Sequence, residues 1–148
     1  NSNNLIEEYV ISKRYPSSLE IKIIETQLLA LSNKRGKSFY IGSNGKLIET
    51  EDVVKNLPYI FGDPNIKKFL SLKRMIDSSK LDYNDIENLF FFPSGRWDIE
   101  LSSGVLIKLP IKNIEKSLEL SLNLLNDKQF DNIKSIDARP RNQVITYE

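Results

Sequence analysis

The chain has 148 residues, of which 40% are apolar and 28% charged, a composition typical of one globular domain or of one domain with part of another. Its 21 lysines and arginines nearly balance its 20 aspartates and glutamates, so the net charge of +1 provides no global attraction to nucleic acid or to anionic membranes. The complete lack of histidine and cysteine excludes Ser–His–Asp triads, histidine-ligated metals, thiolate nucleophiles and disulfides.

The first segment predicts two strands. From Leu5 to Glu25 the chain mainly alternates with a period of two residues, which is typical of strands. Tyr15-Pro16-Ser17-Ser18 interrupts this alternation as a turn, because proline fixes φ and lacks an N–H. The pattern then changes near residues 27–36, which predicts a boundary between this strand pair and a longer series of strands and helices.

A tight hairpin is predicted next. Asn44-Gly45 favours a type I′ turn, and it lies between the apolar stretches Phe39–Ile41 and Lys46–Ile48. Residues Thr50–Val54 are compatible with a single helical turn, which Pro58 would end.

Two amphipathic helices are predicted. The first covers residues 64–79, with Asp63 as its N-cap and Pro64 at its first position, because apolar residues follow at spacings of three and four. The second covers roughly 112–126, with apolar residues on one side.

The remaining segments predict strands. Five stretches are apolar or alternate with period two, and two of them are joined by a Ser-Ser-Gly hairpin turn; they are residues 86–92, 96–101, 105–109, 134–138 and 144–147. The expected fold class is therefore α+β, a mainly antiparallel sheet with two main helices, preceded by a separate strand pair.

Two groups of side chains could carry chemistry. Asp98 and Glu100 point to the strand face opposite Trp97, where a carboxylate pair could catalyse glycoside hydrolysis, but a solvated polar face is the favoured interpretation. The basic loop Lys34–Lys37 precedes aromatic residues, as in sites for single-stranded nucleic acid, but a solvated turn is again favoured.

The last twelve residues indicate a binding module. They form a strand entry, an arginine-rich turn and a closing strand, and an exposed terminal strand offers unpaired N–H and C=O groups to a partner strand. Arg139 and Arg141 beside it can select an acidic partner through bidentate pairing. Asp137 could instead orient Arg139 within the chain, and the two roles are compatible.

Several motifs in a fixed order resemble those of the bacterial cell-division family FtsQ/DivIB. The resemblance covers about residues 9–147. The motifs are Arg14–Glu25 (RYPSSLEIKIIE), Asn44-Gly45, Leu57–Gly62 (LPYIFG), Arg96–Pro110 (RWDIELSSGVLIKLP) and Ile136–Arg139 (IDAR).

This resemblance implies a fold, a location and a role. Residues 1–26 would be the C-terminal part of a POTRA domain and residues 27–148 an FtsQ-type β domain, on the periplasmic face of the bacterial inner membrane at the division septum. A membrane helix, absent from this chain, would anchor the protein. The family implies a scaffold that binds FtsB and FtsL and has no enzymatic activity. Composition and net charge separately predict no cofactor or metal and no nucleic-acid partner.

The resemblance also assigns partner contacts to the end of the chain. By position in the family motifs, Arg96 beside Trp97, and Arg139, would pair with acidic residues of FtsB, and a strand of FtsB would add beside the last strand. Pro140 lacks an N–H, so an added strand can pair only beyond it. The predicted partner-binding residues are Arg96, Trp97, Arg139, Arg141, Asn142, Gln143, Val144, Ile145, Thr146 and Tyr147.

Two other functions remain open at this point. A POTRA module of outer-membrane assembly or secretion also binds by strand addition, but it predicts tandem repeats, and the sequence shows no repeat. A carboxylate-based hydrolase predicts a deep cleft in which Asp98 or Glu100 faces another acid.

Overall fold

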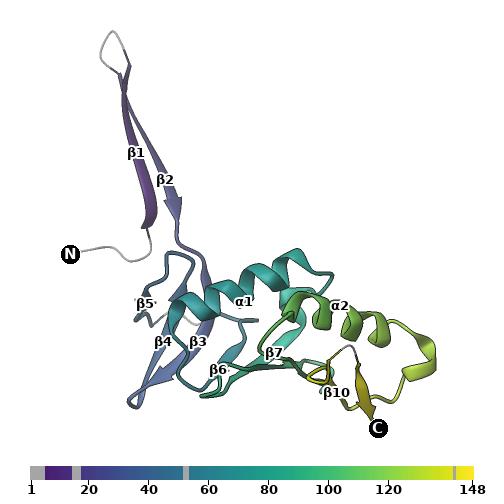
Figure 1. Ribbon diagram of the computed structural model, residues 1–148. Helices are drawn as coiled ribbons and strands as arrows, with labels where there is room; N and C mark the ends of the chain where they lie inside the picture. The colour runs from purple at the N-terminus through teal and green to yellow at the C-terminus, as the bar shows by residue number, and fades with distance from the viewer. Residues whose placement is uncertain (1–5, 15–17, 52–53, 142) are drawn as a thin grey trace.

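The computed structural model describes residues 6–14, 18–51, 54–141 and 143–148, and it describes side chains from residue 25 onwards. These residues form two separate sheets (Figure 1). Strands β1 (Ile6–Arg14) and β2 (Ser18–Glu25) form a two-stranded antiparallel hairpin that extends away from the rest of the chain. The two predicted N-terminal strands are thus confirmed, while Leu5 and the turn residues 15–17 lie outside the described residues.

The second sheet has nine strands in the order β11-β10-β9-β8-β7-β6-β3-β4-β5. Five of its eight neighbouring pairs are antiparallel and three are parallel, so the sheet is mixed. Its strands are β3 (Leu28–Lys34), β4 (Lys37–Gly42), β5 (Leu47–Ile48), β6 (Tyr59–Phe61), β7 (Ile86–Phe91), β8 (Trp97–Leu101), β9 (Leu106–Lys108), β10 (Ser135–Asp137) and β11 (Ile145–Tyr147).

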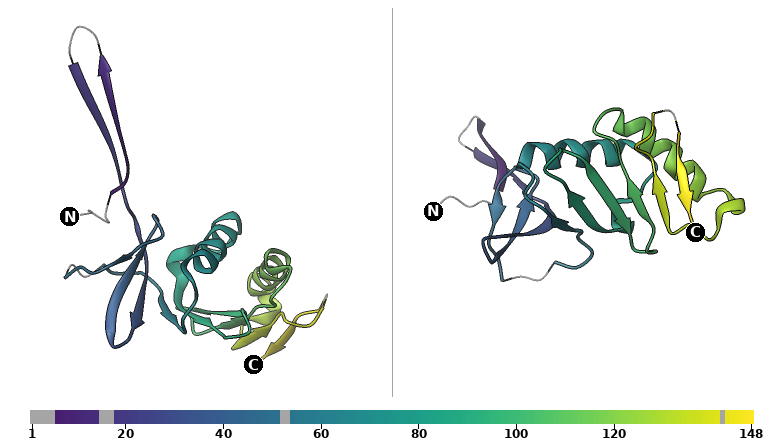
Figure 2. Two further views of the ribbon diagram at one scale, coloured as in Figure 1. Left: turned by 60° about the vertical axis from the view of Figure 1, so that its left-hand side comes forward. Right: turned by 60° about the horizontal axis from the view of Figure 1, so that its bottom comes forward.

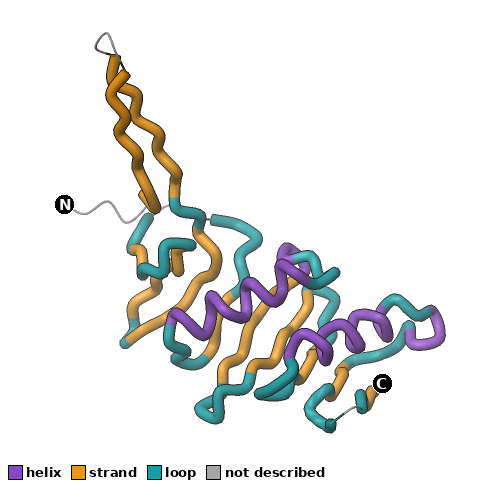
Figure 3. Tube along the Cα trace, turned by 45° about the horizontal axis from the view of Figure 1, so that its top comes forward, coloured by secondary structure: helices purple, strands orange, loops and turns teal. Residues whose placement is uncertain are grey.

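Helices α1 (Ile66–Ser78) and α2 (Ile114–Leu125) cover one face of this sheet, and the opposite face carries no helix among the described residues (Figures 2 and 3). Two short 3-10 turns, Tyr83–Asp85 and Lys128–Phe130, lead into β7 and follow α2. The predicted α+β class with two main helices is confirmed. The core lies between the helices and the sheet and includes Phe69, Leu72, Ile76, Ile99, Ile107, Leu118 and Ile136, each 1% exposed or less.

The start of α1 differs from the prediction. Asn65, not Asp63, is the N-cap, because Asn65 has extended backbone angles and its Oδ1 accepts from the Lys68 N–H at 3.0 Å. Asp63 instead lies 3.6 Å from Lys34 Nζ. The two candidate caps are only two residues apart, so spacing alone could not decide between them.

The predicted helical turn at residues 50–54 is not formed by its described residues, and Asp52 and Val53 lie outside them. The Val54 N–H donates to Tyr40 Oη at 3.2 Å, which ties this segment to β4. A turn at Asn44-Gly45 joins β4 and β5, but the predicted type I′ is wrong. Gly45 has φ +75°, whereas Asn44 lacks the positive φ that a type I′ turn requires at both central positions.

Candidate partner-binding site

Strand β11 forms one edge of the large sheet. Its inner edge pairs with β10, with Ile136 opposite Thr146, and no other described strand pairs with its outer edge. Ile145 and Tyr147 are 40% and 52% exposed and share the helix-free face, whereas Val144 packs against the core. The outer edge of β11 is therefore accessible, and Val144, directly before the strand, is anchored in the core.

Arg139 follows β10 and is held by Asp137. Its Nε donates to Asp137 Oδ1 at 2.8 Å and its Nη2 to Oδ2 at 2.6 Å, while its backbone N–H also donates to Oδ1. This bidentate pair leaves Nη1 and the second Nη2 hydrogen directed away from Asp137. The Arg139 side chain is 43% exposed, so that outward edge can receive a second carboxylate.

The pairing changes the protonation behaviour of both groups. The hydrogen bond from Arg139 is the main reason why the pKa of Asp137 lies below its ordinary value. Asp137 in turn raises the pKa of Arg139. Both alternatives that the sequence left open for Arg139 are therefore compatible with its geometry.

Arg96 lies just before β8 and is oriented from two sides. Its guanidinium carbon is 4.2 Å from the centre of the Phe92 ring, a cation–π contact, and its Nη2 donates to Asp98 Oδ2 at 3.2 Å. Trp97 points to the opposite face, where it is 3% exposed and packs on Phe91. Trp97 thus lies in the core, and it can affect the surface only through the strand that carries Arg96.

The expectation that Asp98 is solvated is wrong. Asp98 is 4% exposed although it lies on the helix-free face, because Arg96 pairs with it and Phe90 and Lys108 flank it on neighbouring strands. Glu100 shares this face, as predicted, and accepts a hydrogen bond from Asn88 at 2.8 Å. Neither carboxylate has, among the described residues, the acidic partner in a deep cleft that the hydrolase alternative predicts.

Burial raises the pKa of Asp98. The positive charges of Arg96, Lys108 and Arg139 lower it, but the increase caused by burial is larger. A carboxyl whose pKa is higher in the folded protein binds its proton more tightly there, so its contribution to stability falls as pH rises from about 4, the unfolded value, through the raised folded value.

The variant Asp98→Asn lacks this pH-dependent contribution to stability. The free energy of unfolding of the variant, relative to that of the parent, should therefore increase between about pH 4 and pH 7. Urea unfolding of both proteins at the two pH values measures this difference. The pH dependence that Asp137 contributes is common to both proteins and cancels. A stability difference that is the same at both pH values would contradict the assignment.

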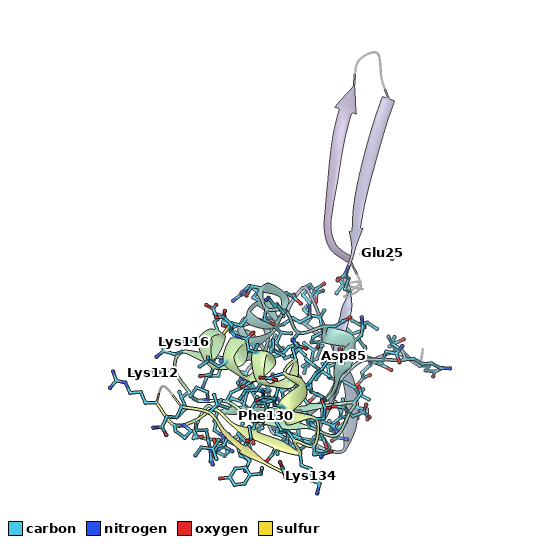
Figure 4. All side chains as sticks on the ribbon, turned by 90° about the vertical axis from the view of Figure 1, so that its right-hand side faces the viewer. Glu25, Asp85, Lys112, Lys116, Phe130 and Lys134 are labelled. Atoms are coloured by element: carbon cyan, nitrogen blue, oxygen red, sulfur yellow. The ribbon has the colours of Figure 1, made fainter. Side chains whose placement is uncertain are left out.

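A pocket of about 770 Å³ lies beside the strand edge, between the start of α2 and residues 138–141 and 143. Four cationic residues line it, together with Glu115 and the half-exposed Leu120. The cations are Lys112, Lys116, Arg139 and Arg141. Figure 4 shows Lys112 and Lys116 at the same end of the molecule as the C-terminal segment.

Lys112 and Lys116 are not among the residues that the sequence singles out. They belong to a helix and its entry that are distant from Arg139 in sequence, and only the packing of α2 on the sheet brings them together. Arg141 and Gln143 are exposed at this pocket, whereas Asn142 lies outside the described residues.

Neither helix among the described residues combines the length and the apolar character needed to cross a membrane.

Comparison with protein families gives a match over most of the chain. A family model described as "Cell division protein FtsQ/DivIB, C-terminal" matches residues 30–139. A "Cell division protein FtsQ" of Rickettsia bellii is 27% identical over 145 residues, covering 96% of this chain and 54% of the relative. A "Cell division protein DivIB" of Clostridium botulinum is 30% identical over 150 residues, covering 89% of this chain and 58% of the relative.

The chain thus spans about half the length of the curated relatives it matches. Among solved structures, the major extracytoplasmic domain of DivIB from Geobacillus stearothermophilus aligns with a TM-score of 0.47 and 16% identity, covering 66% of this chain and 87% of that one.

Proposed function

Because the chain belongs to the FtsQ/DivIB family of cell-division proteins, we propose that it is a non-enzymatic scaffold of the division machinery that binds FtsB and FtsL at the outer edge of β11. The observation that carries this proposal is a terminal strand whose outer edge lies beside a pre-oriented, half-exposed arginine.

The partner contributes a strand to the sheet. Main-chain hydrogen bonds to a sheet edge provide affinity, and pockets beside the edge provide specificity. Pro140 has no N–H, so pairing begins beyond it, in the segment from Arg141 to Tyr147. Val144, directly before β11, contacts the core and anchors the middle of this segment.

Charge selects which strand binds. Arg139 presents the outward edge of its guanidinium beside β11, and Arg96 lies on the same sheet end, held by Phe92 and Asp98. The cations of the pocket add to this local positive charge. We therefore expect the bound segment of FtsB to carry carboxylates next to the residues that pair with β11.

The domain organisation follows the same proposal. The hairpin β1–β2, within residues 1–26, is the C-terminal part of a POTRA domain, and residues 27–148 form the β domain. Its support is that the hairpin forms a sheet of its own, and an isolated two-stranded sheet is at best marginally stable in water. The proposed location is the periplasmic face of the inner membrane at the septum.

Charge reversal at Arg139 tests the proposed site. Arg139→Glu removes the guanidinium and places a second carboxylate beside Asp137, so affinity for the extracytoplasmic segments of FtsB and FtsL from the same organism should fall at least about tenfold. The residual binding should also depend less on salt. Titration calorimetry at two salt concentrations measures both effects.

Lys37→Glu is the matched control, because it makes the same change in net charge at an exposed position of β4, near the opposite end of the sheet. Equal losses of affinity in both variants would indicate a general charge effect, and undiminished binding of Arg139→Glu would refute the proposed role of Arg139.

A further inference from the structure

Five ionisable side chains alternate in sign across the end of the helix-free face. They come from β8 and its entry, from β9, which follows β8 in the same hairpin, and from the segment around β10, which is distant from both in the sequence. In spatial order they are Arg96, Asp98, Lys108, Asp137 and Arg139, here called the charge row.

Strand register places Lys108 at the centre of this row. Lys108 is the cross-strand partner of Asp98 in the antiparallel pair β8–β9 and of Asp137 in the parallel pair β9–β10. Each aspartate then pairs with the arginine two residues away on its own segment. Two interstrand steps separate the aspartates, a distance of about 10 Å.

Lys108 acts on both aspartates electrostatically. It is among the charges that lower the pKa of Asp98 and of Asp137, so it favours the ionised form that each arginine needs as a partner. The other groups facing Asp98 are Arg96 and Glu100 from β8 and its entry, Phe90 from β7, and Arg139 after β10. Among the described residues, Lys108 is thus the one cation in register with both carboxylates.

We propose that Lys108 is a positioning residue that holds Arg96 and Arg139 at a fixed spacing through Asp98 and Asp137. The proposal rests on the function proposed above, because it assumes that the two arginines face an acidic partner. It adds that the partner presents two carboxylates about 10 Å apart, matching the two interstrand steps. Lys108 itself need not contact the partner.

Lys108→Met tests this assignment, since methionine keeps much of the apolar stem and removes the charge. In the free protein, nuclear magnetic resonance titration of the side-chain carboxyls should show the pKa of both Asp98 and Asp137 rising. The Nε–Hε signals of Arg96 and Arg139 should indicate greater mobility. Affinity for the FtsB–FtsL segments should fall about two- to fivefold, the range of single partly exposed ion pairs.

Lys108→Arg should restore the parent values, because it retains the charge, and Lys37→Met should leave them unchanged. Unaltered aspartate pKa values or unaltered arginine mobility in Lys108→Met would overturn the positioning role. An affinity that stays reduced in Lys108→Arg would also overturn the positioning role. A parent protein that does not bind the FtsB–FtsL segments would refute the proposed function instead, while the measurements on the free protein still decide whether the charge row holds the arginines.

Discussion

Deletion of residues 144–148 is expected to weaken the affinity for the FtsB–FtsL segments at least about 100-fold. The deletion removes the backbone of β11 to which the partner strand would pair. Three or four lost main-chain hydrogen bonds of about 1 kcal/mol each account for a loss of this size. The domain should remain folded, because Ile145 and Tyr147 are 40% and 52% exposed and Val144 is the one apolar residue of the deleted segment that packs against the core.

Titration calorimetry measures the affinity, and circular dichroism verifies the fold. The double variant Ile145→Ser, Tyr147→Ser is the matched control, because it retains the backbone and removes the two exposed side chains. Its affinity should fall much less than that of the deletion if strand addition carries the binding. Full binding by the deleted chain would refute the edge of β11 as the site.

Gly62→Ala is expected to destabilise the protein by about 2–4 kcal/mol, combining backbone strain with overpacking. Gly62 follows β6 at φ +97°, a conformation that residues with a Cβ rarely adopt. A Cβ at this position would also lie impossibly close to the carbonyl oxygen of Phe91 on the neighbouring strand, and the backbone would have to move. This is the final glycine of the Leu57–Gly62 motif, and the contact gives that motif a physical reason.

Gly104→Ala is the control for strain alone. Gly104 has φ +90°, but a Cβ added there would meet no atom within 4 Å, so the substitution should cost about 1–2 kcal/mol. Urea unfolding of the parent and both variants gives the comparison. Equal destabilisation by the two substitutions would show that the contact with Phe91 contributes nothing.

Local patterns predicted most elements because they depend on neighbours in the chain. Period-two alternation identified the strands that became β8 and β9, and spacings of three and four identified both helices. Helix starts were displaced by two residues, since Asn113 adopts a left-handed conformation before α2 and Asn65 caps α1. Capping depends on backbone angles that side-chain type alone does not specify.

The burial of Asp98 could not be predicted from local sequence patterns. Alternation correctly placed Asp98 and Glu100 on one face, but it could not show that Arg96 and the side chains of two neighbouring strands remove Asp98 from water. Burial of one residue depends on strand register, and register is set by contacts between residues distant in sequence.

By itself, the sequence determined the α+β class, the family resemblance, the lack of histidine and cysteine chemistry, and the terminal strand with Arg139 beside it, because these depend on composition, local order and motif spacing. Only the tertiary structure decided that β11 lies at a sheet edge, that Lys112 and Lys116 join Arg139 around one pocket, and that Lys108 lies between Asp98 and Asp137. Those arrangements arise from strand order and helix packing, which bring together side chains that no local pattern connects.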